Sequence, residues 1–147
     1  MTYRISTDPS DFNIDTIHSF LSASYWAKDM PKATLEKAIE HSLCFGVLVD
    51  EKSEGEGIQQ VGFARLITDR ATFAYLADVF ILEAHRGKGL SKLLIKTIVE
   101  HPELQGLRRM VLATKDAHGL YQQFGFKAIA QPEIFMEVWD PQVYSNA

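Results

Sequence analysis

Hydrophobic residues recur along this chain with two spacings, one typical of strands and one typical of helices. Three apolar runs occupy residues 43–50, 58–69 and 72–82, and each is bounded by charged or turn-forming residues. Consecutive strands with short connections pair antiparallel, so these runs predict an antiparallel meander of three strands. The charged, glycine-bearing segment 51–57 is expected to form the first hairpin loop.

Apolar residues spaced three and four apart predict the helices. After Gly89 one helical face collects Leu90, Leu93, Leu94, Thr97 and Ile98. The same spacing predicts two helices ahead of the meander. One begins near Asp11, and the other covers 32–42 behind Pro31, a residue suited to the start of a helix.

The remaining elements complete an α/β pattern. They are expected as strands at 3–6, 108–114, 125–129 and 134–139 and as a short helix at 117–124. The order is β-α-α-β-β-β-α-β-α-β-β, and its strand–turn–helix–strand portion at 73–113 implies a parallel crossover. We therefore predict one domain over 1–147, with a mixed, mostly antiparallel twisted sheet of about seven strands and about four helices.

Composition narrows the classes of function. Hydrophobic residues make up 46% and charged residues 23%, as in ordinary globular proteins, and the formal net charge of -4 argues against a general nucleic-acid binder. The single cysteine, Cys44, cannot form an internal disulfide, which favours a cytoplasmic protein. No stretch reaches the roughly 18 apolar residues of a membrane span. The histidines show no metal-ligand spacing, so we expect no metal.

The stretch "AHRGKGLSK" (84–92) lies between a predicted strand and a predicted helix, where backbone N–H groups and the positive helix end face an anion. Arg86 and Lys88 add positive charge. The P-loop pattern fails because Leu90 follows Gly89, and the dinucleotide fingerprint fails because Lys92 stands at its last glycine. Two interpretations of this stretch remain: a site for a coenzyme phosphate, or a plain strand-to-helix turn.

Two segments resemble motifs of the GNAT superfamily of N-acetyltransferases. "ADVFILEAHRGKGLSKLLI" (77–95) is similar to its coenzyme A pyrophosphate signature, Arg/Gln-x-x-Gly-x-Gly/Ala, with Ser91 in place of the final small residue. "LATKDAHGLYQQFGF" (112–126) is similar to N-x-x-A-x-x-L-Y-x-x-x-G-F. The matching residues are Ala117, Leu120, Tyr121, Gly125 and Phe126, whereas Thr114 replaces the usual asparagine.

The resemblance implies a GNAT fold and direct transfer of an acetyl group from acetyl-CoA to an amine in a ternary complex. The coenzyme is expected to contact the main chain of Val79, Phe80 and Ile81. Its further contacts are expected at Arg86, Gly87, Lys88, Gly89, Leu90, Ser91, Thr114 and Ala117. Tyr121 matches the tyrosine that protonates the departing sulfur, and a phenol remains protonated at neutral pH; packing is the alternative role.

The acceptor side is less defined by the motifs. Asp78 is the expected base or substrate contact, with water as the alternative base. Tyr25 and Trp26 are expected in an acceptor pocket that suits an amine, although Trp26 could instead pack the loop onto the core. Arg65 could pair with an acidic group of a substrate or stay at the surface.

We therefore predict a cytoplasmic N-acetyltransferase that acts on a small-molecule primary amine, as a monomer or homodimer, without nucleic-acid or membrane partners. Three alternatives stay open. They are acetylation of a protein N-terminus or lysine, a non-catalytic acyl-CoA-binding sensor, and a nucleotide-phosphate binder.

Overall fold

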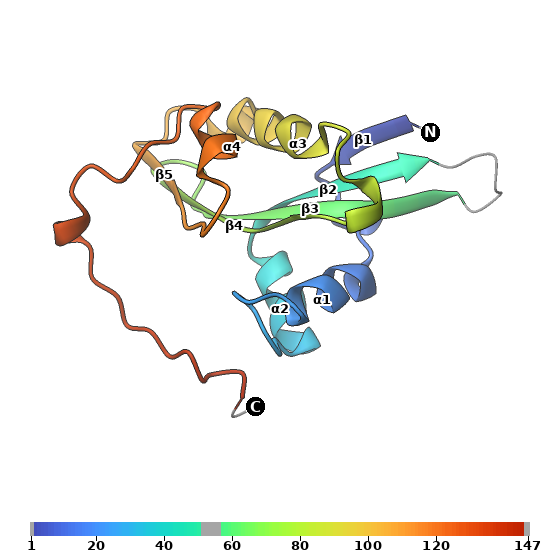
Figure 1. The fold of residues 1–147 in the computed structure, drawn as a ribbon, viewed down its shortest axis with the longest axis horizontal. Coiled ribbons are helices and arrows are strands. Elements are labelled where there is room, and N and C mark those ends of the chain that lie inside the picture. Colours follow the sequence, from blue (N-terminus) through green and yellow to red (C-terminus); the bar gives the residue numbers. More distant parts are fainter. Residues whose placement is uncertain (1, 51–56, 146–147) are drawn as a thin grey trace.

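One five-stranded sheet organises the chain, in the order β1-β2-β3-β4-β5 (Figure 1). Its strands are β1 (Thr2–Ser6), β2 (Leu43–Asp50), β3 (Ile58–Thr68), β4 (Phe73–Ile81) and β5 (Arg109–Leu112). The first four pair antiparallel, and β5 runs parallel to β4, which confirms the predicted meander and crossover. The computed structural model describes residues 2–50 and 57–145, so the predicted loop 51–57 lies almost wholly outside the described residues.

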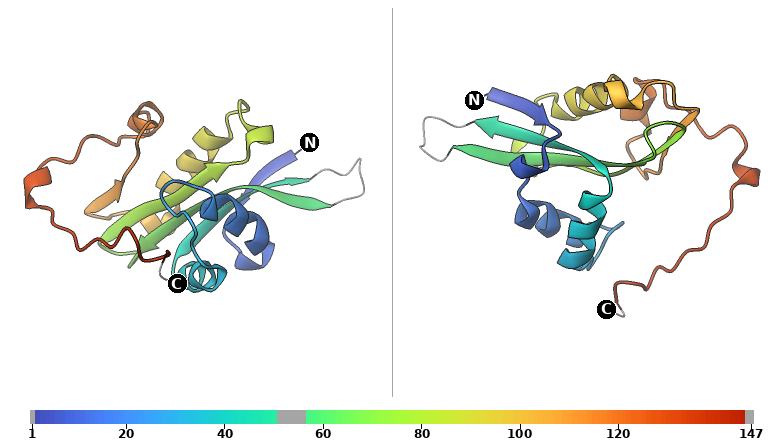
Figure 2. Two further views of the ribbon diagram at one scale, coloured as in Figure 1. Left: turned by 60° about the horizontal axis from the view of Figure 1, so that its bottom comes forward. Right: turned by 180° about the vertical axis from the view of Figure 1, so that it is seen from behind.

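Helices cover both faces of the sheet (Figures 1 and 2). On one face lie α1 (Ile14–Ser22) and α2 (Lys32–Glu40); on the other lie α3 (Leu90–Val99) and α4 (His118–Gln122). Each interface has its own core. The larger, beneath α3, includes Phe45, Leu66, Leu94 and Ile95, and the smaller, beneath α1 and α2, includes Ile17, Leu21, Leu35 and Phe63. None of the described helices is both long and apolar enough to cross a membrane.

Local sequence explains where the helices begin. The helix predicted from near Asp11 begins at Ile14, because Asn13 adopts an extended conformation and its side chain accepts a hydrogen bond from the Thr16 N–H (3.0 Å). Pro31 is the residue immediately before α2, as its position in the sequence predicts.

The pairing of β4 with β5 is short and leaves part of β4 open. The two strands pair from Phe73 with Arg109 to Leu76 with Leu112. Beyond this point, within the described residues, the stretch 77–81 of β4 pairs with β3 alone. The backbone groups of this stretch that face β5 therefore have no strand partner.

The two strands predicted at 125–129 and 134–139 are not present, so the expected seven strands are five. Residues 127–145, which we call the C-terminal arm, run in a largely extended course with a 3-10 turn at Pro132–Ile134 and further turns at 141–145. Every residue from 127 to 143 is exposed, and the arm leaves the body of the molecule beside β5 (Figure 1). Strand formation needs a hydrogen-bonded neighbour, and the arm has none along this course.

Candidate active site

The open stretch of β4 forms the centre of the site. It contains Val79, Phe80 and Ile81, the residues whose main chain was predicted to contact the coenzyme. A register shift opposite Phe63 and Arg65 places a bulge in the strand, and Asp78 within it has a left-handed φ of 58°. The bulge lets the Asp78 side chain meet Trp26 of the α1–α2 loop and Arg65 of β3.

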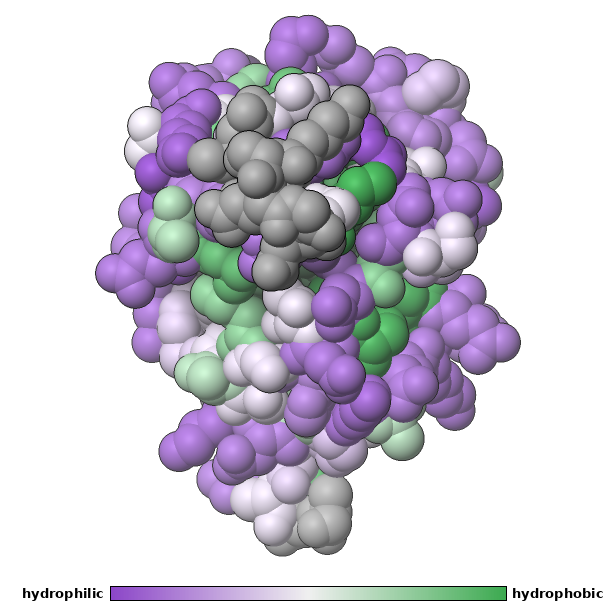
Figure 3. Space-filling view, turned by 90° about the vertical axis from the view of Figure 1, so that its right-hand side faces the viewer, coloured by the Kyte–Doolittle hydropathy of each residue, from purple (hydrophilic) through white to green (hydrophobic). Residues whose placement is uncertain are grey.

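The glycine turn follows β4 after Leu82 and a 3-10 helix at Glu83–His85. Gly87 and Gly89 have φ values of 78° and 77°, and a Cβ at either would meet nothing within 4 Å. Helix α3 begins at Leu90 with Gly89 as its cap residue, so no side chain satisfies the first N–H groups of the helix. The predicted residues 86–89 are all exposed, on an end of the molecule that is mostly hydrophilic (Figure 3). This turn can accept an anion.

Contacts on two sides hold the glycine turn in place. Arg86 donates a hydrogen bond from Nε to the Ile81 carbonyl (2.9 Å), which ties the turn to the end of β4. On the other side, the Tyr3 hydroxyl and His85 Nδ1 are 2.9 Å apart, and Lys88 Nζ lies 5.9 Å from the centre of the Tyr3 ring. Sequence reasoning missed this contact because 82 positions separate Tyr3 from His85 and no spacing along the chain indicates that they meet.

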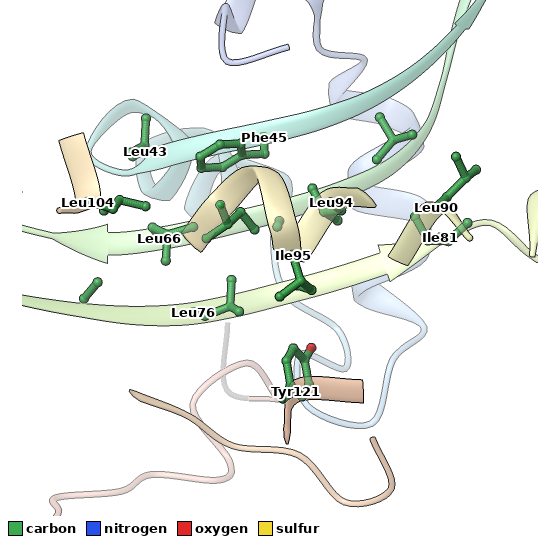
Figure 4. Packing of buried hydrophobic residues seen from close by; sticks show 14 of the residues in the cluster. Leu43, Phe45, Leu66, Leu76, Ile81, Leu90, Leu94, Ile95, Leu104 and Tyr121 are labelled. Atoms are coloured by element: carbon green, nitrogen blue, oxygen red, sulfur yellow. The ribbon is translucent and has the colours of Figure 1, made fainter. Parts of the chain in front are cut away.

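Tyr121 lies beside β4 from the opposite side, on the short helix α4. Its ring is buried and packs edge-to-face on Phe126, with 5.8 Å between the centroids, while the hydroxyl points from α4 toward β4 (Figure 4). The hydroxyl has no hydrogen-bond partner within the described residues, yet these contain no fully buried unpartnered polar side-chain atom, so it contacts solvent. Burial, with a smaller contribution from Tyr25, raises the pKa of Tyr121. The phenol is therefore held protonated.

Asp78 uses both of its carboxylate oxygens within the protein. Oδ2 accepts from Arg65 Nε (2.8 Å) and Oδ1 accepts from Trp26 Nε1 (2.9 Å). The side chains of Arg65 and Asp78 are 13% and 4% exposed, so this is a buried ion pair. Arg65 also donates from Nη1 to Ser42 Oγ (3.2 Å), a partner that no sequence signal indicated. Arg65 therefore neither stays at the surface nor offers a free cation.

Aromatic side chains of the α1–α2 loop form the next wall. The rings of Tyr25 and Trp26 contact edge-to-face at 5.1 Å, and both are substantially exposed. Lys115, from the segment between β5 and α4, places Nζ 4.3 Å from the centre of the Tyr25 ring. Of the two predicted residues, Trp26 therefore contacts Asp78, and Tyr25 contacts Lys115, which precedes α4. Sequence reasoning missed Lys115.

Thr114 and Ala117 lie together at the entry to α4. Thr114 Oγ1 accepts a hydrogen bond from the Ala117 N–H (3.1 Å), so the threonine shapes the turn that precedes Tyr121. Ser91 lies in the first turn of α3 and is half-buried. Its small side chain is compatible with the open glycine turn.

Cys44 lies close to the ion pair but is not suited to nucleophilic chemistry. Burial raises the pKa of its thiol to about 12, which keeps it protonated at neutral pH. The side chain is buried and acts as a small hydrophobic member of the core. Within residues 2–50 and 57–145, no group of three or more His, Cys, Asp or Glu side chains could hold a metal ion.

Comparison with known proteins places this geometry in a family. Residues 12–126 match the model of the acetyltransferase (GNAT) family. A Gibberella zeae protein named as an acetyltransferase is 38% identical over 81% of this chain and 75% of its own length. Human N-acetyltransferase 8B is 31% identical over 82% of this chain and 57% of its own length.

Solved structures show the same fold. The crystal structure of a GNAT-family protein from Xanthomonas campestris is 51% identical, with a TM-score of 0.91 and coverage of 99% of this chain and 98% of that one. N-acetylglutamate synthase from Neisseria gonorrhoeae, complexed with coenzyme A and N-acetyl-glutamate, has a TM-score of 0.67 at 16% identity, over 90% of this chain and 30% of that one. Acetyl transfer from acetyl-CoA is general to the family, and this chain belongs to the GNAT family of acetyltransferases.

Proposed function

We propose that this protein transfers the acetyl group of acetyl-CoA to a primary amine of a small molecule. The observation that carries the proposal is the open stretch 77–81 of β4. It contains the buried Asp78 and leads toward the glycine turn, and Tyr121 lies beside it on α4. A coenzyme donor and an amine acceptor could therefore meet along one strand.

The residues around the open stretch of β4 form a site that fits acetyl-CoA. This coenzyme would supply an activated thioester. The exposed turn 86–89 and the uncapped first turn of α3 suit its pyrophosphate, with Arg86 and Lys88 adding charge. The backbone groups of Val79 and Phe80 that point away from β3 suit the amide-bearing arm, as does the Ile81 N–H, whereas the Ile81 carbonyl already accepts from Arg86 Nε. An N–H in this stretch suits the oxygen that gains charge during attack. The same coenzyme site would be bordered by Ser91, Thr114 and Ala117.

Tyr121 is the proposed general acid. Its raised pKa keeps the phenol protonated, and its hydroxyl is directed toward β4 without a competing protein partner in the described chain. It can therefore donate a proton to the sulfur as the thiolate leaves. The burial of its ring holds the hydroxyl in one position without an added hydrogen bond.

Asp78 is proposed to position the acceptor side of the site, with water as the base. An alkyl ammonium has a pKa near about 10 and must lose a proton before it attacks. Both Asp78 oxygens already accept hydrogen bonds, and accepting a proton would disrupt the ion pair with Arg65. We therefore assign Asp78 and Arg65 to holding Trp26 and the β4 bulge, while the exposed rings of Tyr25 and Trp26 attract the amine by cation–π contact.

The test is release of free thiol from acetyl-CoA in the presence of an amine panel. The panel contains small primary amines, amino acids, a peptide with a free N-terminus and a peptide with an internal lysine. Turnover with small amines that is lost in Tyr121→Phe supports the proposal. Turnover with the peptides alone would replace the small-molecule acceptor with a protein one.

Two binding measurements separate the remaining alternatives. A ligand that binds the folded state raises the unfolding temperature, so acetyl-CoA is expected to stabilise the protein more than ATP does. Stabilisation by ATP alone would overturn the proposal in favour of a nucleotide-phosphate site. Stabilisation by acetyl-CoA without turnover on any amine would point to a non-catalytic sensor.

A further inference from the structure

Lys115 contributes a positive charge to the aromatic wall on the acceptor side. It lies in the segment between β5 and α4, and its Nζ is 4.3 Å from the centre of the Tyr25 ring in the α1–α2 loop. Tyr25 in turn contacts Trp26 edge-to-face, and Trp26 donates a hydrogen bond to Asp78. Three short contacts therefore connect the lysine ammonium to the bulge of β4.

No carboxylate of the described chain balances this charge. Lys115 takes part in none of the ion pairs between described residues, and the neighbouring Asp116 is exposed and not paired with it. An ammonium group has three N–H donors, so contact with one ring leaves donors for a ligand. Because Lys115 is exposed, a ligand can reach it from solvent.

The other charges around the acceptor side are already compensated. Arg65, the cation that the sequence suggested for an acidic group of a substrate, is buried and bound to Asp78. Both Asp78 oxygens accept hydrogen bonds within the protein. The α1–α2 loop adds Lys28 and Asp29, which are exposed and opposite in sign. Among the residues that the structure describes, Lys115 is therefore the charge on this aromatic wall that lacks a counter-charge.

This charge lies near the proposed reacting groups. Tyr25 contributes to the raised pKa of Tyr121, an effect that requires the two phenols to be close. Tyr121 is the proposed general acid, so the Tyr25 ring borders the place where the acetyl group would be transferred. An acceptor that extends along this ring would meet the Lys115 ammonium.

The sign of the charge selects among amines. An acceptor with a second ammonium group would be repelled by Lys115, and a neutral end group would gain no charge interaction from it. A carboxylate would gain a charge-assisted hydrogen bond, and its single negative charge matches the single ammonium. Electrostatics therefore favour an acceptor that has an amine at one end and a carboxylate at the other.

We propose that Lys115 is a specificity-determining residue that binds the carboxylate of a small acceptor, whose amine lies beside Trp26 and the open stretch of β4. The inference rests on the proposed acetyl transfer and narrows the acceptor to amines that also carry a carboxylate. Lys115 then has the role that Arg65, buried and paired with Asp78, is not free to fill.

The test compares ω-amino acids of increasing chain length with their carboxamides, which keep the length and lose the negative charge. Rates are compared per unprotonated amine, because the end group changes the amine pKa. In the wild-type protein kcat/KM should be about tenfold higher for the best acid than for its carboxamide, a value between those of an exposed ion pair and a buried charged hydrogen bond.

Variants of the lysine connect this preference to its charge. The preference should be lost in Lys115→Met, mainly through KM, and retained in Lys115→Arg. The matched control Lys127→Met removes an equal charge from an exposed position outside the site and should keep the preference. Because Lys115 is exposed, its variants should unfold at nearly the wild-type temperature; if Lys115→Met does not fold, Lys115→Gln makes the same comparison.

Binding supplies a second readout that needs no turnover. Calorimetric titration of each acid and carboxamide into the protein saturated with coenzyme A should show the same preference, and the same loss in Lys115→Met. Acetyl-CoA affinity should be equal in the wild type and in Lys115→Met. Weaker acetyl-CoA binding in this variant, with an unchanged preference for acids, would assign the lysine to a coenzyme phosphate and overturn the inference.

The two readouts separate this inference from the proposed function. Turnover of acids and carboxamides with equal efficiency and equal affinity would overturn the role of Lys115 and leave acetyl transfer standing. Lys115-dependent binding of acids without turnover would support the carboxylate site and overturn acetyl transfer. Absence of both turnover and binding would overturn both.

Discussion

Arg65 and Asp78 form a buried ion pair between adjacent strands, with Nε 2.8 Å from Oδ2. Arg65 lies on β3, and Asp78 lies in the bulge of β4. The residue of β4 directly opposite Arg65 is Ala77, the neighbour of Asp78 in the chain. The pair joins the α1–α2 loop to the sheet through Trp26, which donates to the second Asp78 oxygen. Arg65 also donates to Ser42, which lies between α2 and β2. The acceptor side of the site is organised around this contact.

Removal of the arginine should be costly. Arg65→Met leaves the Asp78 carboxylate buried without its cation, and breaking a buried pair from one side costs about 3–5 kcal/mol. Urea unfolding measures the loss. Asn tolerates a left-handed backbone, so Arg65→Met combined with Asp78→Asn should recover part of the stability. An Arg65→Met variant as stable as the wild type would contradict a structural role for the pair.

Tyr121→Phe should lower kcat by about 100- to 10,000-fold, the range of general acid catalysis, with little change in acetyl-CoA affinity. Steady-state kinetics and a binding titration separate these two effects. Because the ring is buried and the hydroxyl has no protein partner in the described chain, the variant should unfold at nearly the wild-type temperature. An unchanged kcat would remove Tyr121 from the mechanism.

The raised pKa of Tyr121 also predicts a pH dependence. Between the ordinary tyrosine pKa of 10.0 and the raised value, the folded state retains a proton that the unfolded state loses. Stability supplied by this group is therefore complete below the ordinary pKa and declines as the pH rises through the raised one. Unfolding measured across the alkaline range should show a weaker decline in Tyr121→Phe. Identical alkaline curves would count against the raised pKa.

Gly89→Ala should weaken acetyl-CoA binding beyond its effect on folding. A non-glycine residue in the left-handed region costs about 1–2 kcal/mol, and relief of that strain would rotate the first N–H groups of α3. Gly106→Ala is the matched control, because Gly106 has φ 76°, meets nothing within 4 Å and lies outside the glycine turn. Calorimetric titration should show weaker binding in Gly89→Ala alone; equal affinities would argue against the turn as the phosphate site.

Cys44 should resist thiol reagents in the folded protein. Its pKa of about 12 leaves almost no thiolate at neutral pH, and the side chain is buried. Labelling with a thiol-reactive chromophore should therefore be slow in buffer and rapid in denaturant. Rapid labelling of the native state would show that the core beside Arg65 opens readily.

The sequence by itself determined the helices, five of the seven predicted strands and the position of the glycine turn. These features are local. The spacing of apolar residues decides which face of α3 is buried, and the left-handed backbone at Gly87 and Gly89 depends only on the few residues that form the turn. The two motifs also led to Tyr121 and to the open part of β4. These predictions needed no information on which strands are neighbours.

The tertiary structure alone decided which polar groups pair and which strands have partners. Asp78 meets Arg65 and Trp26 across 13 and 52 positions, and the bulge that permits this is a matter of register between strands. Residues 134–139 have the composition of a strand, yet a strand exists only where a neighbour supplies hydrogen bonds. The spacing of hydrophobic residues along one segment does not show whether such a neighbour exists.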